Sequence, residues 1–534
     1  MNLGADKKLI RDILSAAGDF PFPVIVGENL TIYPGSVCAL GKRCRMLIVE
    51  DMGKKYLLQF SSSSLPSFIG NPKEMTIKMW DNIKVSILPI TPALVSELSE
   101  SYLSWAKPQP IGNSKPSFGW GNRTNFSSQV VLETFAQWKH TSKFGLVIAQ
   151  NSVRENEILG RLSGFKDVMA EATLAKIMLG YKGITGSDAD HLKTRDEIDE
   201  AIKAGFTGYT LDPSSVLAIT PKVFKRGKER TLAELANDPQ LDRLYTDTTK
   251  RNRLSGYLKR SKKLLRSRFS NLSSGDLKQD ERIIKAVAVK FGDCLSFIRK
   301  GYNQIKKGLG GSKFDFEASF DETATPTDHI AHLLIVNELV TKGVKLTRFA
   351  VKYVGRFEKT TDYIGDIGKF RADYNQHQEI AKFLGHIQSI HSGSGKYSIY
   401  PYVPKAHLKT SGDISRPMIV ALAEADFELY CSLHPQMIKS AKETKRLYGA
   451  VSSPYNNFNT LPKDVKKLGQ KKVAWLLRED VVWRTMSHYA YGIFKSAEGL
   501  FAYSLFHHPH AYWRNVAEVI CAHRDPIYRA NKGI

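Results

Sequence analysis

The stretch Ser187-Asp-Ala-Asp-His-Leu-Lys-Thr194 places two carboxylates, an imidazole and an ammonium within residues 188–193. An apolar run that ends in glycines, residues 177–186, precedes it, and an amphipathic helix pattern, residues 195–204, follows it. Polar groups after a strand and before a helix are typical of catalytic loops in α/β enzymes. A charged cluster also occurs at a solvated helix start, where Asp lies near the positive end of the dipole. The stretch alone leaves both interpretations open.

Outward from this stretch, strand-like and helix-like segments alternate, which is the pattern of a parallel sheet with crossover helices. The strand candidates are residues 144–150, the approach to Gly186, and residues 208–212, 313–319, 346–351 and 387–391. Helix candidates between them include residues 334–340 and 370–384. So many units favour an α/β fold of the (β/α)₈ TIM-barrel type, with a doubly wound sheet as the alternative. No GxGxxG or GxxxxGK[ST] loop follows a strand, so a Rossmann cofactor or P-loop nucleotide is not expected.

The sequence predicts three regions. Residues 1–110 open with a helical pattern and then form a β-rich N-terminal module. Residues 115–435 form the (β/α)₈-like catalytic domain, and residues 436–534 form a helical C-terminal region. Residues 222–311 are helical, basic and poor in strand signals, so we expect them to be an insertion between two barrel strands.

The composition is that of an ordinary soluble globular protein, with 42% apolar and 24% charged residues among 534. No apolar run approaches the roughly 20 residues that cross a bilayer, and the N-terminus has no signal-peptide pattern. The five cysteines are scattered, without CxxC spacing. This favours a reducing, cytoplasmic setting and argues against a thiolate zinc site.

The chain carries 77 basic and 53 acidic residues, a net charge of +24. Part of the excess lies in residues 250–268, where leucines recur among basic residues as in a basic amphipathic helix. Such charge runs are most often a solvated helix face. The alternative is a surface for phosphate polymers, so nucleic acid is kept as a partner through this segment.

Polar groups follow four predicted strand ends, and in a parallel barrel all four emerge on the face that holds active sites. The four sets are Asp188, Asp190, His191 and Lys193; Glu317 with Asp321 and Glu322; Arg356, Glu358 and Lys359; and His391, Ser392, Ser394 and Lys396. Two histidines and one or two carboxylates suit Zn²⁺, Mn²⁺ or a similar divalent ion. A lone His191 is more often structural, and His329 and His332 are predicted to be capping or packing residues.

Several segments resemble the tagaturonate epimerase family, in order, over roughly residues 115–435. They are residues 188–194, Ala204-Gly-Phe-Thr207 with Leu211-Asp-Pro213, Phe316-Glu-Ala-Ser-Phe-Asp-Glu-Thr323, Val354-Gly-Arg-Phe-Glu-Lys359, Asp362-Tyr-Ile-Gly-Asp366, His391-Ser-Gly-Ser-Gly-Lys-Tyr-Ser398, residues 149–155 and His407-Leu-Lys-Thr-Ser-Gly412. The resemblance implies an isomerase of hexuronate metabolism that uses a divalent metal (Zn, Mn, Ni or similar) to interconvert D-tagaturonate and D-fructuronate, or a related keto-sugar acid. Its partner would be a small keto-hexuronate.

The inverted carbon of these substrates lies β to the ketone, so enolisation alone cannot invert it, and retro-aldol cleavage with re-addition is one route. A cation would stabilise the developing oxyanion, and a carboxylate would move the proton. The resemblance implies metal ligands at His191, Glu358 and His391, and catalytic roles for Glu317, Asp190 and Lys193. It implies substrate binding by Arg123, Gln150, Arg154, Asp188, Arg356, Ser392, Ser394 and Lys396. The division between Glu317 and Glu358 stays open, and Asp190 could replace either.

The sequence departs from the family pattern near Asn122. The family has Gly-Phe-Gly-Asp-Arg and then Thr-Pro-Gly-His, whereas this chain has Gly119-Trp-Gly-Asn-Arg123 and then Thr124-Asn-Phe-Ser-Ser. Asn122 cannot ionise, and the histidine has no counterpart. The alternative is therefore a catalytically impaired relative that binds an acidic ligand or polymer through its basic helical insertion.

Overall fold

A computed structural model of the chain describes residues 24–26, 30–40, 44–51, 53–62, 75–80, 83–138, 141–220, 223–225, 228–410, 412–449 and 453–532. The helical pattern expected at the start of the chain lies outside these residues. Two compact units make up the fold. Unit 1 combines Met1–Gln109, Gly119–Ser187 and Thr410–Asp525, and unit 2 combines Pro110–Phe118, Asp188–Lys409 and Pro526–Ile534.

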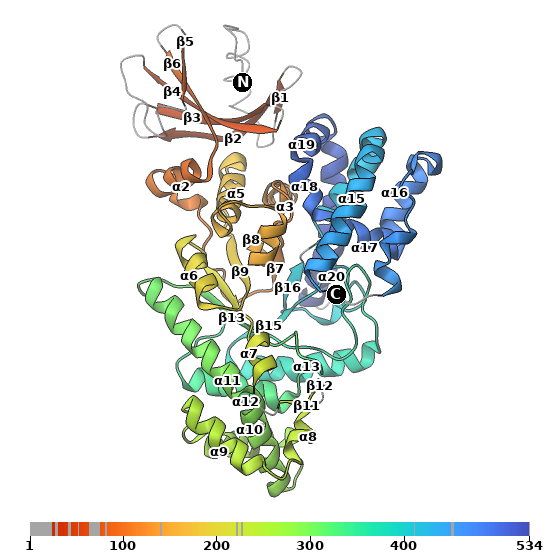
Figure 1. Cartoon of the computed structure of the whole chain (residues 1–534). Helices are drawn as coiled ribbons and strands as arrows, with labels where there is room; N and C mark the ends of the chain where they lie inside the picture. Colours follow the sequence, from red (N-terminus) through yellow and green to blue (C-terminus); the bar gives the residue numbers. More distant parts are fainter. Residues whose placement is uncertain are drawn as a thin grey trace. The chain divides into compact units, whose positions relative to one another are not determined.

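An antiparallel sheet near the N-terminus of unit 1 confirms the predicted β-rich module (Figure 1). Its strand order is β1-β2-β3-β4-β6-β5, with bounds Val24–Val26, Leu30–Leu40, Cys44–Asp51, Lys54–Ser62, Ile83–Pro89 and Thr76–Trp80 in that order. Side chains alternate between two faces, as the pleat requires. Met46, Ile48 and Leu57 pack with α2 (Pro92–Ser101) and the end of α5 (Phe165–Leu179), so one face is covered by helices.

A closed eight-stranded parallel barrel confirms the predicted fold class. Its strands, in order around the barrel, are β7 (Ser117–Trp120), β8 (Gly145–Asn151), β9 (Gly186–Leu192), β10 (Gly208–Leu211), β13 (Asp315–Ser319), β14 (Arg348–Ala350), β15 (Ile387–Ile390) and β16 (His407–Thr410). Apolar and polar residues alike are buried in these strands, because side chains on one face fill the barrel and those on the other meet helices.

One strand prediction needs correction, and two strands were not predicted. The apolar run at residues 177–186 is no strand: it contains the end of α5, which stops at Gly180 with a left-handed backbone. The strand is β9, and the polar stretch itself runs through it. The strands β7 and β16 were also not predicted: β7 directly follows a Pro/Gly/Ser-rich stretch, and β16 has one apolar residue, Leu408, among polar ones.

The helices of the described chain follow these strands and fill the C-terminal region, as expected (Figure 1). Their remaining bounds are α3 Ser127–Ala136, α4 Val153–Ile158, α6 Arg195–Lys203, α7 Ser214–Ile219, α8 Leu232–Ala236, α9 Leu241–Asn252, α10 Tyr257–Arg268, α11 Leu277–Gly308, α12 His329–Thr341, α13 Ile367–Leu384, α14 Ser415–Ala425, α15 Phe427–Leu447, α16 Gln470–Glu479, α17 Val481–Tyr489, α18 Ile493–Ser496, α19 Glu498–His507 and α20 Pro509–Lys532. A small hairpin, β11 (Phe224–Lys225) with β12 (Lys228–Glu229), precedes α8.

The basic segment 250–268 is not one helix. Helix α9 ends at Asn252 and α10 begins at Tyr257, because Arg253 and Gly256 have φ values of 54° and 70°, in the left-handed region that stops an α-helix.

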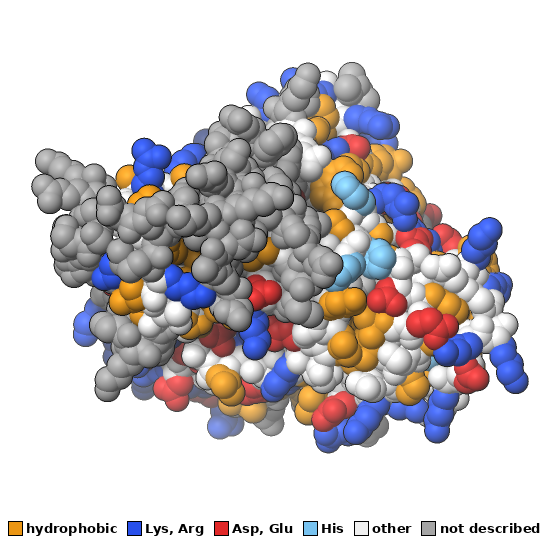
Figure 2. Space-filling view, turned by 90° about the horizontal axis from the view of Figure 1, so that it is seen from above, with side chains coloured by type: hydrophobic (Ala, Val, Ile, Leu, Met, Phe, Trp, Pro, Cys, Tyr) orange, Lys and Arg blue, Asp and Glu red, His pale blue; other side chains and the backbone are white. Residues whose placement is uncertain are grey.

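On the face shown in Figure 2, basic side chains lie among acidic ones over the described surface instead of gathering in one patch. None of the helices in the described part of the chain combines the length and apolar character needed to cross a bilayer.

Candidate active site

A buried ammonium in unit 2 joins three barrel strands. Lys409 Nζ, on β16, lies 2.7 Å from Asp188 Oδ2 and 2.8 Å from Asp190 Oδ1, both on β9. It lies 3.2 Å from Glu317 Oε1 on β13, and it also donates to Thr210 Oγ1 at 2.6 Å. One lysine therefore balances part of a cluster of three buried carboxylates.

These charges determine one another's ionisation. Burial alone would lower the pKa of Lys409, but the carboxylates of Asp188, Asp190 and Glu317 raise it above the ordinary value. Burial acts to raise the pKa of Glu317, yet Lys409 and His391 hold it well below the usual range. Burial raises the pKa of Asp188, with Lys409 opposing. The site therefore keeps Glu317 ionised next to a cationic lysine.

Two histidines and Asp321 lie beside this lysine cluster. The donor atoms of His191, Asp321 and His391 all lie within 4.8 Å of one another, and the two imidazole rings are 4.9 Å apart between centroids. His191 Nδ1 lies 3.0 Å from Asp212 Oδ2, and His391 Nε2 lies 2.5 Å from Glu317 Oε1. Each ring thus has one nitrogen held by a carboxylate, and its other nitrogen is available as a ligand. His391 Nδ1 is buried and lies 3.2 Å from Asp321 Oδ1, within ion-pair distance.

The site favours positive charge. Burial would lower the pKa of His191, but Asp190 and Asp212 raise it to about 10. Burial likewise opposes protonation of His391, but Asp321 and Glu317 raise its pKa to about 9. A divalent cation among these nitrogens and carboxylates would be stabilised by the same negative charges. We call Asp188, Asp190, His191, Glu317, Asp321, His391 and Lys409 the barrel-end cluster.

The backbone is strained at two points of this site. His191 has φ 52° and Ser392 has φ 50°, values that residues other than glycine seldom adopt. Such strain persists where the surrounding structure fixes it, and it concentrates at functional sites. Here it occurs at His191 near the end of β9 and next to His391 after β15, so it sets the direction of both imidazoles.

Lys193 lies at the edge of the cluster, with its ammonium 3.1 Å from Asp212 Oδ2 and 3.0 Å from Glu322 Oε2. Downstream, the Thr194 hydroxyl caps α6 by accepting a hydrogen bond from the Glu197 N–H, and the Glu197 carboxylate accepts one from the Thr194 N–H. This capping box fixes the exit of the chain from the site. The stretch is thus both a site segment and a helix start.

Other predicted residues of unit 2 lie outside the donor groups found among the described residues. Glu358 belongs to none of these donor groups. Its carboxylate lies 3.4 Å from Arg356, whose side chain is exposed. Lys396 donates to the backbone oxygens of Glu358, Thr361 and Ser394 at 2.7, 2.6 and 3.0 Å. Ser392 accepts from Lys359 at 3.0 Å. In this arrangement Lys396 joins two loops.

Arg123, Gln150 and Arg154 belong to unit 1. Arg123 is buried, pairs with Glu155 at 2.6 Å and lies over the Tyr491 ring. The backbone N–H of Gln150 donates to Asn122 Oδ1, and the Asn122 amide donates to Ser128 Oγ at 2.7 Å. Arg154 lies over the Tyr448 ring and lines a cavity of about 600 Å³. The departure at Asn122 is thus accommodated by a buried amide network.

Sequence reasoning assigned no site role to Thr210, nor to Lys409 and Asp212, which lie within segments that resemble the family, and it named Asp321 without a role. The signal for Lys409 lay in His407-Leu-Lys-Thr, where alternate residues of a short barrel strand face inward. A strand assignment there would have placed Lys409 opposite the acids of β9.

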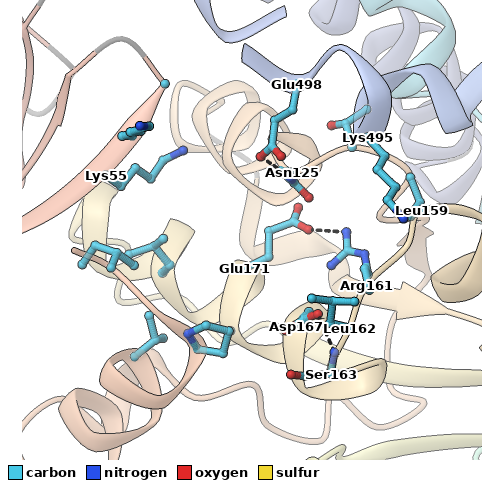
Figure 3. A pocket seen from close by; sticks show the side chains of 18 of the residues that line it. Lys55, Asn125, Leu159, Arg161, Leu162, Ser163, Asp167, Glu171, Lys495 and Glu498 are labelled. Carbon is cyan, nitrogen blue, oxygen red and sulfur yellow. Dashed lines mark hydrogen bonds and ion pairs between the residues drawn. The ribbon is translucent and has the colours of Figure 1, made fainter. Parts of the chain in front are cut away.

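A second cavity, of about 840 Å³, lies in unit 1 and holds none of the predicted site residues (Figure 3). Its charged side chains include Arg161, paired with Glu171 at 2.7 Å, and Glu498, which accepts from Asn125. Its lining residues include no histidine and belong to none of the donor groups found among the described residues, so the cavity is a poorer candidate for catalysis than the barrel-end cluster.

Several basic side chains of residues 250–268 are also paired within the fold. Arg251 lies 2.9 Å from Asp293, Arg260 lies 2.7 Å from Glu338, and Lys262 pairs with Glu281. These pairs reduce the charge available to a polymer, and polymer binding by this segment stays a prediction.

Comparison with known proteins agrees with the resemblance. A family model described as tagaturonate epimerase matches residues 33–522. The tagaturonate/fructuronate epimerase of Thermotoga maritima is 29% identical over 439 residues, covering 80% of this chain and 84% of that protein.

Solved structures of the fructuronate-tagaturonate epimerase UxaE from Cohnella laeviribosi share the fold. The native structure has a TM-score of 0.73 at 22% identity, and one with two glycerols has 0.74 at 23%. Each comparison covers 98% of this chain and 99% of the other.

Proposed function

Because the chain belongs to the tagaturonate epimerase family, we propose that it interconverts tagaturonate and fructuronate at the barrel-end cluster. The observation that carries the proposal is the family match over residues 33–522, which includes every residue of that cluster. The dense set of buried ionisable groups is what acid–base chemistry on a sugar acid requires.

We further propose that His191, Asp321 and His391 hold a divalent metal. Two imidazoles and one carboxylate make a common three-ligand set that leaves a position for substrate. His391 Nδ1 is buried and faces Asp321 Oδ1 at 3.2 Å, so the two atoms are placed to bind one ion. Asp212 and Glu317 would fix the ring tautomers, as carboxylates behind metal-bound histidines do. In this set Asp321 takes the place that the sequence gave to Glu358.

When bound, the ion would supply Lewis-acid polarisation of the substrate ketone. The protein side chains would do the proton work. A base removes the proton from the hydroxyl of the inverted carbon, and the bond to the carbon next to the ketone breaks. Its electron pair passes to the ketone, so an aldehyde and an enolate form. Rotation of the aldehyde and re-addition on its other face restore that bond with inverted configuration, and the proton returns to the new hydroxyl.

Asp190 is the better candidate for this base, although the sequence favoured Glu317. The Asp190 side chain is 11% exposed, whereas Glu317 is 1% exposed and lies between His391 and Lys409. Burial opposes ionisation of Asp190, but Lys409 and the two histidines lower its pKa, so it is an ionised acceptor. Lys409 would hold Asp190 in place, and Glu317 would position His391.

Turnover in D₂O tests both the reaction and its route. If the carbon–carbon bond breaks, fructuronate formed from tagaturonate keeps its original hydrogen at the inverted carbon, because that hydrogen stays on the aldehyde. Deuterium at that carbon would contradict bond cleavage while leaving the epimerase assignment intact. Absence of any fructuronate would contradict the assignment itself.

A further inference from the structure

A second group of histidines lies on two helices of unit 2, outside the barrel strands. His329 is the first residue of α12, and Asp373 and His377 lie one turn apart on α13 (both helices labelled in Figure 1). One ligand atom from each lies within 4.8 Å of the others. His329 Nε2 is 2.9 Å from Asp373 Oδ1, and His377 Nε2 is 3.7 Å from the same oxygen. The group shares no residue with the barrel-end cluster.

One buried nitrogen of this group lacks a hydrogen-bond partner. His377 is fully buried, and its Nε2 has no hydrogen-bond partner. The distance of 3.7 Å to Asp373 is too long for a hydrogen bond. It is close to the roughly 3.4 Å that separates two ligand atoms on a tetrahedral zinc ion with bonds of about 2.1 Å.

The hydrogen bond of the other ring nitrogen of His377, Nδ1, determines whether Nε2 carries a lone pair. His377 Nδ1 lies 2.9 Å from His332 Nδ1, and His332 Nε2 lies 3.0 Å from His386 Nε2. A neutral His332 has one N–H, so the chain has a direction. If His377 Nδ1–H donates to His332, then His332 Nε2–H donates to His386. His377 Nε2 then bears a lone pair that faces a carboxylate, an arrangement that a cation stabilises.

Each direction of the chain has a cost. The first leaves an N–H on His386 Nδ1, a buried atom without a hydrogen-bond partner. The reverse places an N–H on His377 Nε2, 3.7 Å from Asp373, with the Thr327 carbonyl as a further acceptor beside the ring. A cation bound at His377 Nε2 selects the first direction, because a coordinating nitrogen carries no proton. A metal ligand that donates its other ring nitrogen to a second group is the usual arrangement behind metal-bound histidines.

From this geometry we propose that His329, Asp373 and His377 form a second divalent-metal site, of the zinc class, that fastens α12 to α13. His329 is 32% exposed, so an ion can enter from solvent and keep a water as its fourth ligand. Asp373 Oδ2 accepts the Val354 N–H at 3.0 Å, at the start of the loop that carries Arg356 and Glu358. The ion therefore holds this loop as well as the two helices.

Zinc content measured on the full chain tests the proposal. The protein is stripped with a chelator, dialysed against Zn²⁺ and then against metal-free buffer, and analysed for zinc per chain. His329→Ala and Asp373→Asn should each retain one ion fewer than the wild type and show a smaller zinc-induced rise in Tm. Asp373→Asn keeps an oxygen for the Val354 N–H, and His510→Ala, an exposed histidine elsewhere, is the matched control.

The two metal sites are separable in this experiment. His191→Ala should lose the ion of the barrel-end cluster and keep the second one, whereas His329→Ala should do the reverse and still convert tagaturonate. Equal zinc content in wild type, His329→Ala and Asp373→Asn would overturn the second site. That outcome would leave the epimerase proposal untouched.

Discussion

Nε2 of His391 lies 2.5 Å from Oε1 of Glu317, and both side chains are buried. This contact fixes which nitrogen of His391 faces Asp321. Replacing Glu317 by Gln removes the anion that orients the ring, so metal affinity should fall by about 10- to 100-fold, the usual effect of losing such a partner. Titration of the chelator-stripped protein with Zn²⁺ measures this, and unchanged affinity would show that Glu317 does not position the ligand.

Asp321 distinguishes the proposed metal ligands from those expected from the sequence. Asp321→Asn should lose the ion of the barrel-end cluster, because a carboxylate ligand becomes a neutral amide. Glu358→Gln should retain it, since Glu358 lies in none of the donor groups of the described residues. Elemental analysis of both variants decides between them. Loss of metal in Glu358→Gln alone would restore the sequence-based set.

Glu322→Gln is the matched control for Asp321→Asn. Glu322 belongs to another donor group, with His191 and Asp212, but its carboxylate is exposed and pairs with Lys193 at 3.0 Å. We expect this variant to keep its metal. If Glu322→Gln loses the ion and Asp321→Asn does not, the ion is held by that other group.

Lys409 should matter to folding as well as to turnover. Lys409→Met leaves three buried carboxylates without their shared cation. Removing one partner of a buried ion pair typically costs about 3 to 5 kcal/mol, so urea denaturation should show a loss of that order. Lys405→Met, at an exposed lysine four residues earlier, is the control and should be nearly neutral. A Lys409→Met protein as stable as the control would mean that the carboxylates are protonated or solvated.

Acid should destabilise the C-terminal helices through His434. Burial lowers the pKa of His434 from 6.5 to about 4, against a hydrogen bond from its Nε2–H to Pro462 O. The unfolded chain gains a proton below about 6.5, and the folded chain does so only near 4, so the free energy of unfolding falls as pH drops through that window. The loss should approach about 3 kcal/mol.

His434→Gln removes this titration. Denaturation at several pH values between 7 and 4 should show a shallower decline for the variant than for the wild type, whatever its stability at neutral pH. If the free energy of unfolding declines equally in the variant and the wild type, His434 has the same pKa in the folded and unfolded chains.

The alternation of strands and helices predicted the barrel, because each βα unit is a local pattern. The position of β9 was not predictable from hydropathy. Asp188 and Asp190 lie within the strand and point to a polar barrel interior, where ion pairs neutralise their charge. By hydropathy, the apolar run before β9 is therefore more strand-like than β9 itself. Lys409 was missed for the same reason, since β16 reads His-Leu-Lys-Thr.

The choice of metal ligands depends on distances that sequence spacing does not contain. Glu358 and Asp321 both follow barrel strands, and only the packed structure brings Asp321 next to His391. His329 and His332 were predicted to cap or pack, whereas their partners His377 and His386 come from elements that pack on α12 only in the folded chain. Residues that pair across helices leave no periodic signal in one sequence.

The central proposal is that this chain interconverts tagaturonate and fructuronate at the barrel-end cluster with the help of a divalent metal. The most direct measurement is incubation of chelator-stripped, folded protein with tagaturonate after reloading with one divalent ion at a time, following fructuronate by NMR. We predict conversion with at least one ion, none in the stripped protein, and none in Asp190→Asn that has kept its metal. Failure to form fructuronate with any ion would contradict the account.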